Sequence, residues 1–252
     1  MTTSGLVPDD MTSLLQRVRW HLSSVLGDTD YRRFLVLSRS RTGSYLFTSY
    51  LSSHPQALAH GEIFRRLAGR RYGDVLERAF GRYPARLKAV GFKLFYYHPL
   101  DEASPELWEE LAADRELHVI HLVRRDLLKT LVSRARAQAT DEWKRTVREP
   151  RATIEAAATA PMTIDEKWFE EQWRKTRRWQ EEARSRFPNH PFLEVTYEEL
   201  VKELQPTFDG VTDFLGLARH RPTTSMAKQS SAPLEQSVSN LRTLQDLAER
   251  LG

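Results

Sequence analysis

The decisive stretch of the sequence is Phe34-Leu35-Val36-Leu37-Ser38-Arg39-Ser40-Arg41-Thr42-Gly43-Ser44. It joins four consecutive apolar residues to a group of small polar and basic ones. A short apolar run with such a boundary is typical of a buried strand in a parallel sheet. The residues from Tyr45 to Ser53 favour a helix. The stretch therefore predicts a strand, a tight turn and a helix that starts near Ser44.

The same alternation of strand and helix recurs along the chain. Strands separated by helices favour right-handed βαβ units and a parallel sheet. We therefore expect an α/β fold in which helices flank a central parallel sheet, formed by a single domain over residues 1–252. The further predicted strands are 90–97, 117–123 and 192–197, and the further predicted helices are about 126–139, 165–187 and 198–215.

Other segments lie outside this pattern. The apolar spacing over 11–27 predicts an N-terminal helix as an appendage, and the polar, proline-containing segment 140–164 predicts a mobile loop. A short helix is expected to close the chain. Residues 1–26 lack the apolar centre of a signal peptide, and no run approaches the ~18 apolar residues of a membrane span. We therefore expect a cytoplasmic protein.

The composition narrows the classes of function. The 252 residues include no cysteine, which excludes disulfides, cysteine nucleophiles and thiolate metal sites. The formal net charge is +4, from 38 basic and 34 acidic residues, an excess too small to favour nucleic-acid binding. A local anion site fits this charge. We expect no metal site, because no motif such as H-E-x-x-H occurs.

The turn after the first predicted strand has the features of a phosphate-binding loop. Its backbone N–H groups and the following helix N-terminus attract an anion, Arg41 adds a positive charge, and Thr42 and Ser44 add hydroxyl donors. It lacks the G-x-x-x-x-G-K-[ST] pattern that binds a triphosphate and Mg²⁺. The turn therefore suits a nucleotide without a triphosphate tail. The alternative is a tight connection with a serine cap on the helix.

A second anion site is predicted at the end of the strand 117–123. Arg125 follows this strand and Ser133 lies two helical turns later, so both side chains can line one side of a crevice. An arginine and a hydroxyl can together bind a phosphate. The alternative is a surface arginine beside Asp126 as a helix N-cap. Two such sites at two strand ends suggest one ligand with two separated phosphates.

The two motifs, in this order, resemble the PAPS-dependent sulfotransferase superfamily, and within it the bacterial carbohydrate sulfotransferases of the nodulation-factor type. Residues 38–46 are similar to the family's 5′-phosphosulfate loop, with Arg41 where many members have lysine. Residues 122–133 are similar to its 3′-phosphate motif, with Asp126 in place of the common asparagine. Further similarity extends the resemblance over about residues 33–217, in the segments 53–55, 60–64, 91–94, 193–200 and 214–217.

The resemblance implies a P-loop-like three-layer fold and a particular reaction. The enzyme would transfer a sulfuryl group from PAPS to a hydroxyl of a carbohydrate or glycolipid, with PAP as product and without a metal ion. Arg41 would face the 5′-phosphosulfate and stabilise the leaving group. The cofactor-binding residues that it implies are Arg39, Ser40, Arg41, Thr42, Gly43, Ser44, Tyr45, Arg125, Ser133 and, in the late polar loop, Lys228.

The resemblance also points to catalytic residues. Glu62 is the expected general base for the acceptor hydroxyl, although a glutamate here can also cap a helix or pair with Arg65 or Arg66. Lys93 lies within an apolar strand, where an unpaired charge is costly, and the resemblance places it on the transferring group. Its alternative is a lysine that reaches solvent.

Two histidines are further candidates for the base. His98 ends the strand that contains Lys93, but cytosolic sulfotransferases carry their histidine two residues after the lysine, where this chain has Phe95. His60 is either a base or a residue that orients Glu62.

Two other functions stay open. A small-molecule kinase of similar topology needs a Gly-Lys-Ser/Thr sequence that the first turn lacks, and a non-catalytic nucleotide-binding protein implies a decayed site. The acceptor is expected to meet segments without readable motifs, chiefly 64–88 and 140–165. The helical spacing of Trp168 and Trp179 favours a core position over stacking on a ligand. The N-terminal helix is a candidate contact for a homo-oligomer.

Overall fold

The computed structural model describes residues 27–140, 161–226 and 233–252 of the chain. Its centre is a five-stranded sheet with the order β2-β3-β1-β4-β5, and every neighbouring pair of strands is parallel. The parallel sheet confirms the expectation from the alternating strands and helices. The strands are β1 (Arg32–Ser38), β2 (Ala57–His60), β3 (Ala89–Phe95), β4 (His118–Val123) and β5 (Phe192–Thr196).

β1 is the central strand, with β3 and β4 as its neighbours. The four predicted strands correspond to β1, β3, β4 and β5. The sequence pattern does not predict β2, because this edge strand has only four residues and so shows no clear period. The predicted strand 90–97 ends early, at Phe95, because His98 N–H turns back to Phe95 O at 3.0 Å.

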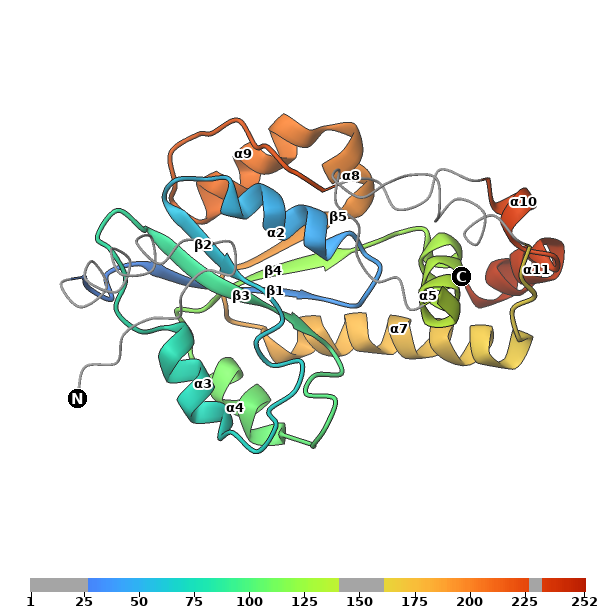
Figure 1. Ribbon diagram of the computed structural model, residues 1–252, viewed down its shortest axis with the longest axis horizontal. Helices are drawn as coiled ribbons and strands as arrows, with labels where there is room; N and C mark the ends of the chain where they lie inside the picture. The colour runs from blue at the N-terminus through green and yellow to red at the C-terminus, as the bar shows by residue number, and fades with distance from the viewer. Residues whose placement is uncertain (1–26, 141–160, 227–232) are drawn as a thin grey trace.

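Helices cover both faces of the sheet and complete three layers, which confirms the predicted class (Figure 1). α2 (Ser44–Ser52), α8 (Tyr197–Lys202) and α9 (Leu204–Phe214) lie on one face. α3 (Tyr72–Ala79), α4 (Pro105–Ala113) and α7 (Glu166–Arg186) lie on the other. Beyond the sheet, one apolar cluster joins α7 to α5 (Leu127–Thr140), α10 (Leu234–Ser237) and α11 (Leu241–Leu251).

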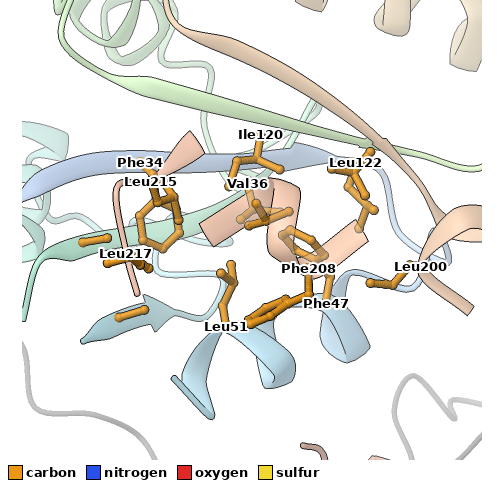
Figure 2. Close-up of a cluster of buried hydrophobic side chains, with 14 residues drawn as sticks. Phe34, Val36, Phe47, Leu51, Ile120, Leu122, Leu200, Phe208, Leu215 and Leu217 are labelled. Atoms are coloured by element: carbon orange, nitrogen blue, oxygen red, sulfur yellow. The ribbon is translucent and has the colours of Figure 1, made fainter. Parts of the chain in front are cut away.

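The side chains of β1 alternate between two apolar cores. Phe34 and Val36 pack with side chains of α2 and α9 (Figure 2). Leu35 and Leu37 pack on the opposite face, in the core that includes α3, α4 and α7. All four are fully buried, and burial of one such side chain stabilises the fold by about 1.5–3 kcal/mol. The same alternation directs Arg39, just after the strand, toward the α7 face.

The predicted helix 198–215 is two helices in the structure. α8 starts with a capping box, in which the Thr196 hydroxyl accepts from Glu199 N–H and the Glu199 carboxylate accepts from Thr196 N–H. The backbone leaves helical geometry at Glu203, with φ −130° and ψ 53°. α9 then carries Pro206 in its first turn, where the missing N–H has no intrahelical partner to lose.

Parts of the prediction fall on residues that the structure does not describe. Residues 11–26 of the expected N-terminal helix and residues 141–160 of the expected loop 140–164 lie outside the described residues. Within the described ranges, no helix combines the length and apolar character of a membrane span.

Candidate active site

The turn between β1 and α2 is shaped by two residues with left-handed backbone. Arg41 has a φ of 71° and Gly43 a φ of 83°. A Cβ on Gly43 would lie 2.4 Å from Tyr197 Cδ2, so only glycine fits between the turn and the start of α8. The left-handed conformation of Arg41 costs about 1–2 kcal/mol, so the surrounding contacts must hold the turn in this shape.

The turn presents polar groups that its own fold leaves unused. The first N–H to close a bond within α2 is that of Phe47, on Gly43 O at 3.0 Å, and no side chain caps this helix, so its earlier N–H groups suit an external acceptor. The hydroxyls of Ser38 and Ser40 are buried and lack a partner among the described residues. Thr42 instead donates to a carbonyl of the turn at 2.9 Å. This donor set fits a phosphate.

The structure brings the two predicted anion sites together. Arg41 Nε donates to Ser133 Oγ at 2.9 Å, which joins the β1–α2 turn to α5. Arg124, at the end of β4, donates from Nη1 to Arg41 O at 3.2 Å. Its guanidinium also lies 4.5 Å from the centre of the Tyr197 ring. Positive charge is thus concentrated where a ligand would span the ends of β1 and β4.

Arg125 does not join this cluster of contacts and instead pairs with glutamates of α8. Its side chain is exposed, its Nη2 donates to Glu199 Oε1 at 2.6 Å, and its backbone N–H donates to Glu198. Asp126 Oδ1 accepts from Lys129 N–H at 2.9 Å, which is an N-cap interaction of α5. These are the contacts of a surface arginine and a capping aspartate, and the contact of Arg125 with a phosphate stays a prediction.

Glu62, Lys93 and His98 converge at the carboxyl end of β3. Lys93 N–H donates to Gly61 O at 3.3 Å, which continues the β2–β3 pairing and places Glu62 beside Lys93. Glu62 Oε1 lies 3.1 Å from Lys93 Nζ, and Oε2 lies 3.6 Å from His98 Nε2. Lys93 is fully buried and does not reach solvent. Its ammonium is compensated by the carboxylate of Glu62, because a buried charge needs a close counter-charge.

Tyr45 covers this ion pair from the first turn of α2. Lys93 Nζ lies 3.3 Å from the centre of the Tyr45 ring, in a cation–π contact. Burial raises the pKa of Tyr45, and so do the charge of Glu62 and the hydrogen bond that its carboxylate accepts. Tyr45 therefore stays protonated at neutral pH. Because it belongs to α2, it links the phosphate-binding turn to Glu62.

The two candidate histidines have different partners. Burial lowers the pKa of His98 to about 4, against the opposing charge of Glu62. Phe95 N–H donates to His98 Nδ1 at 3.4 Å, which leaves the proton of the neutral ring on Nε2, facing Glu62. His60 Nε2 lies 2.8 Å from the hydroxyl of Tyr83, and burial lowers its pKa to about 4. His60 therefore shares a hydrogen bond with Tyr83 and does not orient Glu62.

Arg39 lies on the opposite face of the sheet from Lys93. It is fully buried, and its Nη1 donates to Thr176 Oγ1 of α7. Burial lowers its pKa to about 10, and the nearby charge of Arg134 adds to this effect. Its side chain therefore points away from the N-terminus of α2. Its place among the donor-binding residues stays a prediction, and the geometry does not support it.

Some contacts at the site are not evident from the sequence. Tyr97 accepts a hydrogen bond from Ser40 N–H at 3.3 Å, and Tyr197 packs against Gly43. The sequence signal for both tyrosines is their position at the end of a strand, where ligands bind in parallel sheets. Trp179 is half-buried, with its ring centre 5.4 Å from that of Tyr97, so it is not a core residue.

Two further predictions concern Lys228 and the absence of a metal site. Lys228 lies outside the described residues. Among the residues that are described, no three His, Asp or Glu side chains are grouped so that they could hold a metal ion.

Known proteins resemble the chain in sequence and in fold. The model of a family described as Stf0 sulphotransferase matches residues 99–242. Nodulation protein H of Rhizobium meliloti (strain 1021) is 27% identical over 232 residues, which cover 84% of this chain and 89% of that protein. Nodulation protein H of Rhizobium tropici is 25% identical over 221 residues, which cover 82% and 85%. A sulfotransferase structure from Alicyclobacillus acidocaldarius, 16% identical, has a TM-score of 0.50, with 86% and 93% of the two chains covered.

Proposed function

Because the chain belongs to the Stf0 sulfotransferase family, we propose that it transfers a sulfuryl group from PAPS to a hydroxyl of a carbohydrate or glycolipid. The relatives confirm the resemblance to nodulation-type sulfotransferases that the sequence motifs indicate. The observation that carries the proposal is the position of Glu62. Its carboxylate is fixed by the buried Lys93 and contacts Tyr45, which belongs to the helix that follows the phosphate-binding turn.

The donor site fits PAPS in its chemistry. The unused N–H groups at the start of α2, the Ser40 hydroxyl and Arg41 would hold the 5′-phosphosulfate. Ser133, which already bonds Arg41, would hold the 3′-phosphate together with Arg125. PAPS supplies an activated sulfuryl group and a phosphate that leaves with negative charge. The turn lacks the Gly-Lys pair of a triphosphate site, which favours this donor over ATP with Mg²⁺.

Glu62 accepts the proton of the acceptor hydroxyl in this proposal. Its Oε1 lies 3.1 Å from Lys93 Nζ, and its Oε2 lies 3.6 Å from His98 Nε2, which is beyond a good hydrogen bond. Burial keeps His98 neutral at pH 7, and its Nε2 faces the Glu62 carboxylate. Lys93 and Tyr45 provide fixed positive charge and a hydroxyl donor beside the reacting group, which stabilises developing negative charge.

Thermal unfolding with PAP tests the donor assignment. A ligand at 100 times its dissociation constant adds about 2.7 kcal/mol to the free energy of unfolding. We expect PAP to raise the unfolding midpoint in the presence of EDTA, and ATP with Mg²⁺ to have little effect. A larger shift with ATP and Mg²⁺ than with PAP would support a small-molecule kinase instead.

A further inference from the structure

Arg39 is a buried arginine whose hydrogen bonds are incomplete. Of its guanidinium nitrogens, Nη1 donates to Thr176, while Nε and Nη2 are buried and have no hydrogen-bond partner in the part of the chain that the structure describes. No carboxylate of the described residues forms an ion pair with it. A guanidinium has five N–H donors and no acceptor, and burying it unpaired is strongly unfavourable. An anion at this place would complete its bonding.

Arg134 is a second arginine with the same deficit. It follows Ser133 on α5, and its Nε and Nη1 are buried without a partner among the described residues. Tyr97 connects the two arginines, because its hydroxyl bonds the N–H of Ser40, next to Arg39, while the centre of its ring lies 5.7 Å from the Arg134 guanidinium. The charge of Arg134 also contributes to the lowered pKa of Arg39. Two like charges are thus close together, and none of the described residues provides a carboxylate that pairs with either of them.

We propose that Arg39 and Arg134 form a subsite for an oxyanion group of the acceptor, which is a carboxylate, sulfate or phosphate. The proposal rests on the sulfotransferase function and specifies its substrate as an anionic acceptor. Arginine forks bind the oxygens of such groups in pairs. One bound oxyanion would compensate both charges and accept the donors that are now unused.

The position of the subsite favours the acceptor over the nucleotide. The Arg39 side chain contacts α7, which covers the face of the sheet opposite to α2, the helix whose N-terminus is proposed to hold the 5′-phosphosulfate. Beside it, Tyr97 and the half-buried Trp179 form an aromatic pair, which is a surface that suits a sugar ring. Tyr97 is also next to His98, with ring centres 5.5 Å apart, and His98 contacts Glu62. An acceptor on this pair can therefore reach both the base and the arginines.

A rearrangement inside the protein is the competing explanation. Gln172 Oε1, one turn before Thr176 on α7, is also buried without a partner among the described residues, so a rotamer change can pair it with Arg39. This pairing leaves the donors of Arg134 unexplained. Arg134 is also less buried than Arg39, and its replacement is therefore the safer test of the subsite.

The test uses inorganic sulfate as the probe on the full chain saturated with PAP. Thermal unfolding is followed in sodium sulfate and in sodium chloride of equal ionic strength. We expect sulfate to stabilise the wild type in a saturable way, and Arg134→Gln and Arg39→Gln to weaken the apparent sulfate affinity about tenfold or more. The control is Arg178→Gln, the same change at an exposed position of α7, which should keep the wild-type affinity. Sulfate that binds near Lys93 would stabilise the wild type and the variants equally, so it would not change the difference in stabilisation between them.

Each outcome decides the proposal. Equal sulfate affinity in the wild type, Arg134→Gln and the control contradicts the subsite. Weakened PAP binding in Arg134→Gln, with the sulfate effect retained, places this arginine in the donor site and overturns the acceptor assignment. If Arg39→Gln does not fold, Arg134→Gln alone decides. The response of the wild type to PAP is read separately, since its absence contradicts the proposed function, whereas loss of the sulfate difference contradicts only the subsite.

Discussion

Replacement of Glu62 by glutamine separates the catalytic role of this residue from its structural role. The amide keeps the shape of the side chain and an oxygen that can accept a hydrogen bond from Lys93 Nζ. In the wild type this nitrogen lies 3.1 Å from Glu62 Oε1. The replacement removes the charge that compensates a fully buried ammonium. Loss of one partner of a buried ion pair costs about 3–5 kcal/mol, and the remaining amide oxygen places the expected cost near the lower limit. Loss of a general base lowers turnover by about 10²–10⁴-fold.

A double variant provides the matched control. Lys93→Met added to Glu62→Gln removes the uncompensated ammonium, and replacing a whole buried pair with apolar groups is often neutral for stability. We expect Glu62→Gln alone to lower the free energy of urea unfolding by about 3 kcal/mol, and the double variant to recover most of this loss. Neither variant should turn over PAPS, and Glu62→Gln should still bind PAP.

The refuting result is equally specific. Turnover by Glu62→Gln within about threefold of the wild type, well short of the loss expected for a general base, would exclude Glu62 as the base. Recovery of turnover together with stability in the double variant would show that the loss came from misfolding and not from chemistry.

Three further predictions follow from the geometry. Gly43→Ala should abolish PAP binding in calorimetry, because the left-handed backbone and the contact with α8 leave no space for a Cβ; unchanged affinity would contradict the described turn. Arg125→Gln should weaken PAP about tenfold and leave AMP, which lacks the 3′-phosphate, unaffected; equal loss for both would place Arg125 elsewhere. Burial lowers the pKa values of His60, His98 and His121, the last a buried residue of β4, from 6.5 to about 4, so the unfolded chain binds protons first as the pH falls through this range. The free energy of urea unfolding should therefore decrease from pH 6.5 to 4, by at most about 3 kcal/mol for each histidine, and a value independent of pH would refute this.

The sequence predicts the strand, turn and helix around the donor site because the signals there are local. A continuous apolar run indicates β1, and small polar residues before a helix indicate the turn. The need for glycine at position 43 is different, since it depends on Tyr197, which is far away in the sequence. Contacts of that kind are set by the packing of α8 against the turn and have no local signal.

The catalytic cluster shows where prediction from the sequence reaches its limit. Glu62 and Lys93 are each expected at the site, but their ion pair depends on the pairing of β2 with β3, and β2 is too short to be predicted. Arg39 shows the reverse case. The alternation of Leu35 and Leu37 along the strand already directs the side chain of the next odd residue to the α7 face, so the sequence pattern alone indicates that the Arg39 side chain points away from α2.

The central claim is tested most directly by the transfer of label from [³⁵S]PAPS to a panel of glycans and glycolipids, neutral and anionic. The account predicts that label moves to a hydroxyl of an acceptor with equimolar release of PAP, in the presence of EDTA, and that Glu62→Gln does not transfer it. A protein that binds PAP tightly but labels no acceptor in the panel would contradict the account and indicate a non-catalytic nucleotide-binding protein.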